Sequence, residues 1–216
     1  MSDYIETNIA HYNANADQLA ESYLSVSTED SLPVFNQLIK GYQGEDCQAL
    51  EIGCGAGGDA FWLSQKGWSV NAVDGSASFI EYARDRFHSP NLNFLLSAAP
   101  DFSELEQHDK VYNLILGAAF IFHFDALGRK KIYDRLKGML APSGLIHFTL
   151  RNGPIPQGRV MFPVVADELE MFAVDNRFSF KKHGEKIDFL GRMDVTWTHV
   201  SVWRGKEWDH AREIFL

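Results

Sequence analysis

A glycine-rich segment between an apolar run and an amphipathic run constrains the fold of this chain more than any other feature. Four glycines fall within six residues, at Gly53, Gly55, Gly57 and Gly58. The apolar residues before them predict a strand, and the run from Ala60 to Lys66 predicts a helix. A strand, a glycine loop and a helix in this order bring backbone N–H groups close to a bound ligand. Side chains on the first three glycines would block that approach, and glycine tolerates the positive φ angles that such a turn needs.

Two carboxylates are placed around this loop. Glu51 lies two residues before Gly53, and Asp74 ends a second strand that begins at Trp68. Asp74 follows Gly57 by 17 residues, which is near the spacing of about 20 at which an acid beyond a glycine loop binds a ribose. A carboxylate suits a ribose because it only accepts hydrogen bonds, whereas the diol offers two O–H donors.

The segment Glu51-Ile52-Gly53-Cys54-Gly55-Ala56-Gly57 and the later Asp74 resemble motifs I and II of the class I S-adenosylmethionine-dependent methyltransferases. The resemblance implies S-adenosyl-L-methionine as cofactor and S-adenosyl-L-homocysteine as product, with Asp74 on the ribose and the glycine loop on the methionyl part. Gly53, Gly55 and Gly58 also satisfy the dinucleotide pattern G-x-G-x-x-G. Glu51 favours the methyltransferase, because a purely apolar strand would precede a dinucleotide loop. A glycine turn without a ligand is the remaining alternative.

The alternation of strands and helices predicts an α/β fold, with a mostly parallel sheet covered by helices on both faces. The resemblance implies a doubly wound, Rossmann-like sheet of seven strands in the order 3-2-1-4-5-7-6, with the last strand antiparallel. The strands are expected at residues 48–52, 68–74, 92–96, 111–116, 145–150, 178–182 and 195–203. We expect one methyltransferase domain over residues 1–216, with a cap of two helices (1–41), a cofactor-binding core (45–203) and a C-terminal tail (204–216). In the family, such an N-terminal extension often covers the mouth of the site.

The resemblance also implies a set of cofactor-binding candidates at strand ends and in the helical cap. They are Tyr12, Tyr23, Glu51, Gly53, Cys54, Gly55, Gly57, Asp74, Gly75, Phe79, Ser97, Ala98 and Gly117. After the third strand the family commonly has an acidic or polar residue for the adenine, whereas this chain has Ser97-Ala98. The adenine contacts are therefore expected from Ser97, the Ala98 backbone or Phe79. An ordinary core position remains open for Tyr12, Tyr23 and Phe79.

Substrate-binding candidates follow the fourth and fifth strands. Phe120 and Phe122 precede His123, which is a candidate general base near neutral pH or a packed histidine that orients its loop. Arg151 and Arg159 flank a proline-containing segment and can bind a carboxylate or phosphate, or else pair with the many acids of the protein. The aromatic residues hint at an apolar or aromatic small molecule, or belong to the core. The stretch 150–162 looks like a signature of a bacterial subgroup of the family.

The composition limits which classes of binding partner and which cellular compartment we expect for this chain. The chain has a net charge of −9, which disfavours DNA and RNA because phosphate binding needs clustered Lys and Arg. Its longest apolar stretch, Leu114 to Phe122, is well below the roughly 18 residues of a membrane span. The only cysteines, Cys47 and Cys54, indicate no disulfide framework, and no metal-ligand spacing is present. We therefore expect a cytoplasmic monomer or homodimer that binds a small-molecule substrate, with no metal, nucleic-acid or membrane partner.

The predicted function is methyl transfer from S-adenosylmethionine to an oxygen, nitrogen or sulfur atom of a small molecule. A nicotinamide-dependent oxidoreductase is the first alternative, since Tyr133-Asp134-Arg135-Leu136-Lys137 matches the Tyr-x-x-x-Lys of short-chain dehydrogenases. The Thr-Gly-x-x-x-Gly turn of those enzymes is absent, however. The second alternative is a catalytically silent cofactor-binding or interaction protein with the same fold.

Overall fold

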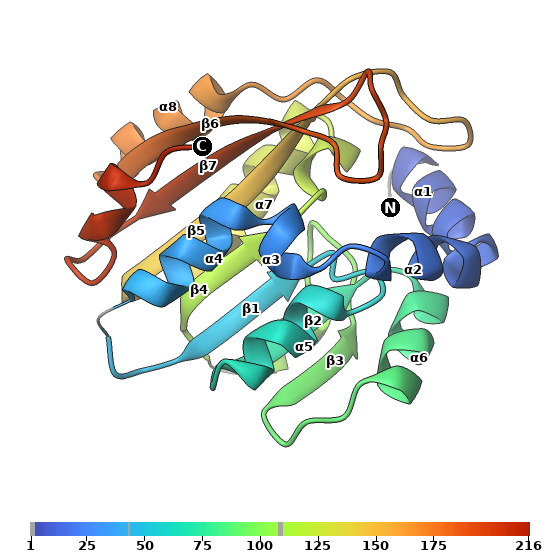
Figure 1. Cartoon of the computed structure of the whole chain (residues 1–216), viewed down its shortest axis with the longest axis horizontal. Helices are drawn as coiled ribbons and strands as arrows, with labels where there is room; N and C mark the ends of the chain where they lie inside the picture. The colour runs from blue at the N-terminus through green and yellow to red at the C-terminus, as the bar shows by residue number, and fades with distance from the viewer. Residues whose placement is uncertain (1–2, 43, 108–109) are drawn as a thin grey trace.

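A seven-stranded sheet forms the centre of the computed structural model, which describes residues 3–42, 44–107 and 110–216 (Figure 1). The strands are β1 (Gln48–Ile52), β2 (Ser69–Asp74), β3 (Leu92–Leu96), β4 (Tyr112–Gly117), β5 (Leu140–Asn152), β6 (Ser179–Ile187) and β7 (Thr196–Trp203). Their order in the sheet is β3-β2-β1-β4-β5-β7-β6, and β7 runs antiparallel to both β5 and β6. This topology confirms the predicted fold.

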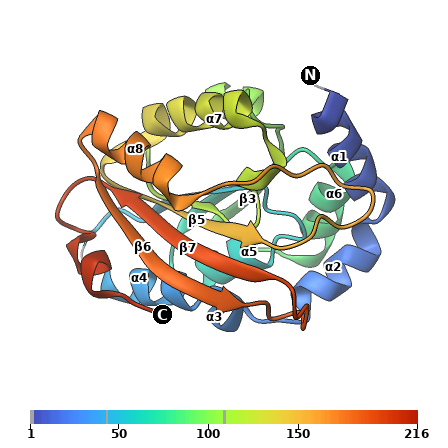
Figure 2. The same ribbon diagram turned by 90° about the horizontal axis from the view of Figure 1, so that it is seen from above.

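Helices cover both faces of the sheet, as Figure 2 shows for α7 and α8 on one side and α3 and α4 on the other. The α-helices are α1 (Asp3–Ala14), α2 (Ala16–Leu24), α3 (Thr28–Ser31), α4 (Pro33–Gly41), α5 (Gly58–Gln65), α6 (Ala77–Arg86), α7 (Ala126–Met139) and α8 (Ala166–Asn176). Short 3₁₀ turns are η1 (Ser103–Gln107), η2 (Ile121–His123) and η3 (Asp209–Glu213).

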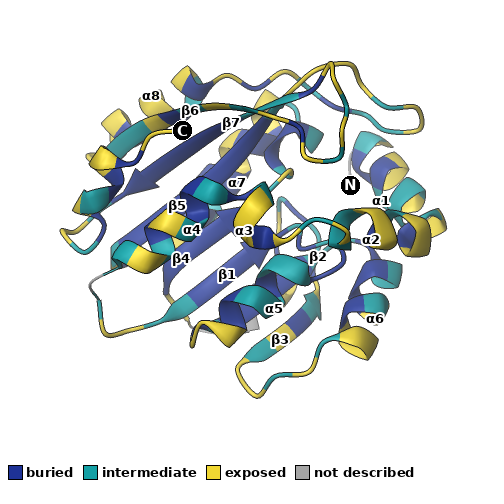
Figure 3. Ribbon diagram, viewed as in Figure 1, coloured by how far each residue is buried: buried dark blue, intermediate teal, exposed yellow. Residues whose placement is uncertain are grey.

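Each face of the sheet packs against its own hydrophobic core, and both cores are buried (Figure 3). In β1, Ala49 lies in the core that contains Leu63 of α5, whereas Leu50 lies in the core that contains Leu136 of α7. Successive residues of a strand point to opposite faces, so a strand covered on both sides must be apolar throughout. The central strand β4 is buried along its whole length and is apolar from Leu114 to Gly117, whereas its buried Asn113 accepts a hydrogen bond from the backbone N–H of Gln48 at 3.3 Å.

Three expectations about secondary structure are wrong, and one of them is the end of β6, which continues to Ile187 rather than ending at residue 182. The N-terminal region holds four helices rather than two, because Ser27 caps α3 by accepting a hydrogen bond from the backbone N–H of Asp30 and Pro33 begins α4. The fifth strand, β5, is expected at residues 145–150 but begins at Leu140 and includes residues 141–144. The register of the β4–β5 ladder shifts between Tyr112 and Leu114, next to this unexpected start.

The C-terminal tail docks on its own chain. Trp208 and Ala211 are fully buried in the core that contains Phe35 and Leu38 of α4. His210 extends this contact, since its Nε2 lies 3.0 Å from the carbonyl oxygen of Leu38. In the part of the chain that the structure describes, no helix combines the length and the apolar composition needed to cross a membrane.

Candidate active site

The glycine loop between β1 and α5 lines a cavity of about 310 Å³ at the carboxyl ends of the central strands. Gly53 and Gly55 have φ angles of 67° and 50°. A Cβ on Gly53 would overlap the Phe120 ring, whereas a Cβ on Gly55 would meet no atom within 4 Å. Gly53 therefore makes room for Phe120, and Gly55 leaves the backbone open to a molecule in the cavity.

Three carboxylates lie around this loop, of which Glu51 is buried and Asp59 and Asp74 are half-buried. Asp74, at the end of β2, accepts hydrogen bonds from the backbone N–H of Gly55 at 2.9 Å and of Ser76 at 2.8 Å. Asp59, in the first turn of α5, accepts one from the Thr28 hydroxyl at 2.5 Å. Glu51, at the end of β1, is 2% exposed, and its Oε2 has no hydrogen-bond partner in the part of the chain that the structure describes.

Burial raises the pKa of all three carboxyl groups. For Glu51 the pKa lies well above its ordinary value, and the charges of Asp59 and Asp74 raise it further. For Asp59 the Thr28 hydrogen bond opposes the effect of burial, and for Asp74 the backbone N–H groups of Ser76, Gly55 and Gly75 oppose it. A cation here would stabilise the ionised carboxylates, and an ammonium group would give Glu51 Oε2 the donor that it lacks. This side of the cavity, defined by Glu51, Asp59 and Asp74, is called the acidic side below.

The N-terminal helices cover the loop that follows β2. The Phe79 ring lies 5.8 Å from that of Tyr12 and 6.2 Å from that of Tyr23, centroid to centroid. Asn13 Oδ1 accepts hydrogen bonds from the Ser76 hydroxyl at 2.8 Å and from the Ser78 backbone N–H at 3.2 Å. All three rings line the cavity, so the cap contributes directly to its wall.

His123 and Tyr12 form a hydrogen-bonded pair in this wall. The Tyr12 hydroxyl lies 3.0 Å from His123 Nε2, and His123 Nδ1 lies 3.5 Å from the Val160 carbonyl oxygen. A carbonyl only accepts, so this contact assigns the proton to Nδ1 and leaves Nε2 to accept from Tyr12. Burial, with smaller effects of Arg159, Arg151 and His11, lowers the pKa of His123 to about 4, although the Val160 carbonyl opposes the shift. The ring is therefore neutral at neutral pH.

Two arginines on the β5 side of the cavity have no carboxylate partner among the described residues. Arg151 Nη1 donates to the Gly153 carbonyl oxygen at 3.2 Å, and its Nε is buried without an acceptor. The Arg159 guanidinium lies 5.1 Å from the centroid of the Tyr12 ring, and its Nε donates to His11 Nε2 at 3.4 Å. The alternative that these arginines pair with acids therefore finds no support in the geometry. This region, defined by Arg151 and Arg159, is called the basic side below.

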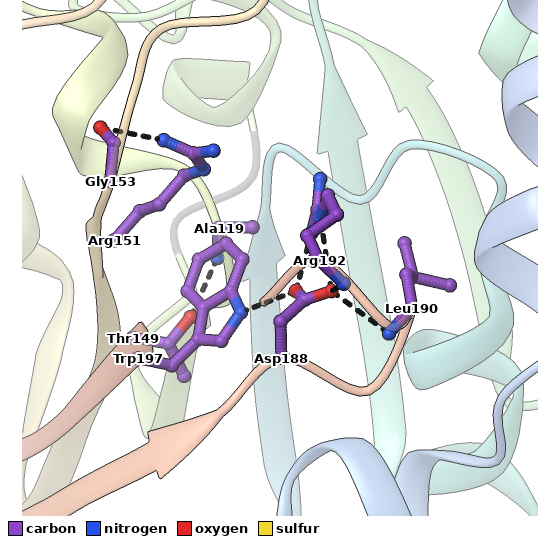
Figure 4. A network of polar contacts seen from close by, with 8 residues as sticks. All are labelled: Ala119, Thr149, Arg151, Gly153, Asp188, Leu190, Arg192 and Trp197. Atoms are coloured by element: carbon purple, nitrogen blue, oxygen red, sulfur yellow. Dashed lines mark hydrogen bonds and ion pairs between the residues drawn. The ribbon is translucent and has the colours of Figure 1, made fainter. Parts of the chain in front are cut away.

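A third arginine, on the turn between β6 and β7, is neutralised. Arg192 donates to Asp188 from Nε at 2.9 Å and from Nη2 at 2.5 Å (Figure 4). Trp197 Nε1 donates to the same carboxylate at 2.8 Å. Burial works against ionisation, but these hydrogen bonds prevail and lower the pKa of Asp188 to about 2. In Figure 4 the Trp197 ring lies between Arg151 and the Asp188–Arg192 pair.

The structure brings nearly all the predicted site residues together. The exceptions are Ser97 and Gly117, which are not among the residues that line the cavity. Ser97 Oγ accepts a hydrogen bond from the backbone N–H of Glu104, and a Cβ on Gly117 would overlap the Phe148 ring. Both residues thus have packing roles, and a cofactor contact of either stays a prediction. All the other candidates line the cavity: Tyr12, Tyr23, Glu51, Gly53, Cys54, Gly55, Gly57, Asp74, Gly75, Phe79, Ala98, Phe120, Phe122, His123, Arg151 and Arg159.

Several cavity residues escaped sequence reasoning. Asp59 directly follows the glycines, but an acid in the first turn of a helix is also an ordinary partner of the helix dipole. Trp197 and His199 come from β7, where a regular alternation of residues gave no sign of a site. Asn8 of α1 also lines the cavity. Its contacts with a segment 152 residues away have no local sequence signal.

Comparison with known proteins gives matches that agree with this geometry. Residues 49–144 match a family model described as a methyltransferase domain. A segment of 107 residues, 46% of this chain, is 36% identical to malonyl-[acyl-carrier protein] O-methyltransferase of Acetivibrio thermocellus. That match spans only 36% of the length of the relative.

Two further matches extend over most of the chain. A probable S-adenosyl-L-methionine-dependent methyltransferase, TehB of Haemophilus influenzae, is 19% identical over 94% of this chain and 68% of its own. Among solved structures, 1,6-didemethyltoxoflavin-N1-methyltransferase of Burkholderia thailandensis, with bound 1,6-didemethyltoxoflavin and S-adenosylhomocysteine, has a TM-score of 0.69 at 12% identity. The superposition covers 94% of this chain and 90% of that one, and at this identity it supports the fold alone.

Proposed function

Because the chain belongs to the class I S-adenosylmethionine-dependent methyltransferases, we propose that it transfers a methyl group from S-adenosylmethionine to an oxygen, nitrogen or sulfur atom of a small molecule. The observation that carries the proposal is the acidic side of the cavity, where Glu51 has a buried oxygen without a partner beside an open glycine backbone. S-Adenosylmethionine has an ammonium and a sulfonium group, and both are attracted by such a site.

The chain has a residue for each part of this cofactor. Glu51 would hold the amino group, the backbone of Gly53–Gly57 would face the methionyl part, and Asp74 would accept from the ribose hydroxyls. When bound, the cofactor supplies an electrophilic methyl group. The protein supplies orientation and a cavity that excludes water, and orientation alone can lower a barrier by roughly 7–11 kcal/mol.

His123 fits a positioning role better than that of a general base. A base is most effective when its pKa lies near the working pH, whereas the pKa of His123 is lowered to about 4. Its Nε2 accepts from Tyr12, which holds the phenol over the cavity. We assign His123 to orienting Tyr12, and an acceptor that enters already deprotonated requires no protein base.

The acidic side also argues against the nicotinamide alternative. A dinucleotide places a pyrophosphate on the glycine loop, and Glu51, Asp59 and Asp74 would repel those charges. Tyr133 of the Tyr-x-x-x-Lys match is buried in α7 between Phe148 and Phe172 and does not line the cavity. No structural observation favours a catalytically silent protein.

The proposal is tested by binding and by turnover. Titration calorimetry should show binding of S-adenosylhomocysteine and none of NAD. A panel of small acceptors, with S-adenosylhomocysteine release as the readout, should then give turnover with at least one class of nucleophile. Binding of NAD instead of S-adenosylhomocysteine would overturn the proposal. Cofactor binding without turnover on a broad panel would favour the silent alternative.

A further inference from the structure

We infer that the methyl acceptor carries an oxyanionic group, a carboxylate or a phosphoryl group, which binds between Arg151 and Arg159 on the basic side of the cavity. The identification of the ligand as a methyl acceptor rests on the proposed function. The anion site itself is argued from the geometry alone. Arg151 is the penultimate residue of β5 and Arg159 follows that strand, whereas Glu51 is the penultimate residue of β1 and Asp74 is the last residue of β2.

The first step is the unsatisfied hydrogen-bonding capacity of Arg151. Its guanidinium has five N–H donors, and among the described residues one hydrogen bond is formed, from Nη1 to the Gly153 carbonyl oxygen. Its Nε is buried and has no acceptor within residues 3–42, 44–107 and 110–216. Burial and the neighbouring arginines Arg192 and Arg159 lower the pKa of Arg151, although Asp188 and Asp194 partly offset them. An anion would supply both the missing acceptors and the missing charge.

The second step is that the side chain of Arg159 is positioned by two neutral groups, the Tyr12 ring and the His11 ring. It lies over the Tyr12 ring and donates to His11, and both contacts leave its charge uncompensated. Burial and Arg159 together lower the pKa of His11, so this partner does not add a positive charge of its own near neutral pH. A planar guanidinium fixed in this way is suited to a carboxylate or phosphoryl oxygen.

The third step concerns the two nearby acids, of which Asp188 is already hydrogen-bonded to other groups and Asp194 is exposed to solvent. Asp188 is taken up by Arg192, Trp197 and the backbone N–H groups of Leu190 and Arg192. Asp194 is exposed, and among the described residues no ion pair joins it to Arg151 or Arg159. The chain therefore neutralises Arg192 but not the two arginines of the basic side.

The fourth step is the separation of opposite charges across the sheet. The strand order places β4 between β1 and β5, so the acidic side and the basic side lie apart within one cavity. A cationic cofactor and an anionic acceptor are each attracted to a different side. Phe120, Phe122 and Trp197 line the same cavity and can contact the apolar body of the acceptor.

The test uses benzoate and phenyl phosphate as probes, with neutral benzamide as their matched control. Each is titrated by calorimetry, at constant ionic strength, into the full chain with and without saturating S-adenosylhomocysteine. We expect at least one of the two anions to bind and benzamide not to bind. Tighter binding of benzoate would indicate a carboxylate site, and tighter binding of phenyl phosphate would indicate a phosphoryl site. Arg151→Gln and Arg159→Gln should each weaken the anion by about tenfold or more, since a charge-assisted hydrogen bond is lost.

Arg86→Gln is the matched control, because Arg86 is exposed at the end of α6 and does not line the cavity. It should leave anion binding unchanged, and all three variants should keep their circular dichroism spectra. A second readout is the His123 ring by NMR: a bound anion offsets Arg159 and Arg151, so the pKa of His123 should rise from about 4.

The two proposals fail separately. Arginine-dependent anion binding without any binding of S-adenosylhomocysteine would overturn the methyltransferase and leave the anion site standing. Binding of S-adenosylhomocysteine with no anion binding would overturn the anion site alone. Equal loss in Arg86→Gln and in the two cavity variants would also overturn it, because the anions would then respond only to net charge.

Discussion

Asp74 connects the two loops that form the acidic side. Its carboxylate accepts from the backbone N–H groups of Gly55 and Ser76, which belong to different loops. A carboxylate has about four acceptor positions, so it can also accept from a ribose.

Asp74→Ala should weaken the binding of S-adenosylhomocysteine by roughly one to two decades, because a charge-assisted hydrogen bond contributes about 1.5–3 kcal/mol. Calorimetry measures the change. Asp85→Ala, on the exposed face of α6, is the control and should bind as the wild type does. Unchanged affinity in Asp74→Ala would refute the ribose assignment.

Glu51 gives a second prediction at this scale, the pH dependence of cofactor binding. Burial holds the pKa of Glu51 well above its ordinary value, and a bound ammonium group favours the ionised form. Binding therefore releases a proton at pH values below the raised pKa, and affinity should increase as pH rises, by at most about one decade per pH unit for one proton. Glu51→Gln should flatten this slope in calorimetry between about pH 5.5 and 8. The slope that remains in the variant belongs to Asp59 and Asp74, and an undiminished slope would contradict the role of Glu51.

Residues tied to a local motif were predictable, whereas residues from distant segments were not. Glu51 and Asp74 follow from their spacing to the glycines, and both line the cavity. Trp197 reaches the cavity only because β7 pairs with β5. That pairing depends on contacts between segments about 45 residues apart, which no short window of sequence can reveal.

At the scale of elements, β5, β6 and β7 share a chain of buried polar groups. His183 Nδ1 donates to the Ile214 carbonyl oxygen at 2.9 Å, so its Nε2 accepts from Ser201 at 2.9 Å. Ser201 in turn accepts from His147 Nδ1 at 2.9 Å, and His147 Nε2 accepts from His199 Nδ1 at 3.2 Å. One carbonyl oxygen thus sets the direction of every hydrogen bond in the chain, so the rings of His183 and His147 must be neutral, and burial favours the neutral form of His199.

This histidine chain predicts a loss of stability in acid. Burial, together with His183 and Lys186, lowers the pKa of His199 to about 4, whereas the unfolded value is about 6.5. Between these values the unfolded state binds more protons, so the contribution of His199 to stability falls with falling pH, by up to about 1.4 kcal/mol per pH unit.

His199→Asn keeps a donor near the position of Nδ1 and removes this titration. The free energy of unfolding is measured by urea denaturation for the variant and the wild type. The variant value minus the wild-type value should increase as pH falls from about 6.5 towards 4. Taking the difference cancels the opposite effect of Glu51, Asp59 and Asp74, whose raised pKa values favour the folded state in acid. His88→Asn, at an exposed position, is the control and should show no such gain. A constant difference for His199→Asn would contradict the prediction.

Elements with a regular pattern were predicted well, and irregular ones were not. The boundaries of β1 and β3 match the expectation at both ends. The cap was harder, because α3 has only four residues and depends on the Ser27 cap. The start of β5 is irregular, and only its pairing with Tyr112 of β4 extends the strand to Leu140.

At the scale of the whole molecule, α1 is joined to the segment after β5 beside the cavity. Asn8 of α1 donates to the Val160 carbonyl oxygen at 2.9 Å and accepts from the Val160 backbone N–H at 2.8 Å. This double contact ties the N-terminal cap to the segment after β5, next to Arg159. Both α1 and α2 also pack against α6. The N-terminal helices therefore contact both the acidic side and the basic side of the cavity.

Removal of the Asn8 contact should loosen the cap and the acceptor side together. Asn8 is 5% exposed, so Asn8→Ala leaves the Val160 N–H without a partner and leaves the Val160 carbonyl oxygen only its longer contact with His123 Nδ1, at a cost of about 1–3 kcal/mol. Hydrogen exchange should become faster both in α1 and around residues 158–162, and saturating S-adenosylhomocysteine should slow both regions less than in the wild type. Asn176→Ala is the matched control, because Asn176 donates only to the Phe172 carbonyl oxygen within its own helix, α8. Faster exchange in α1 alone would mean that the cap and the basic side move independently, since a cap that couples them must change both at once.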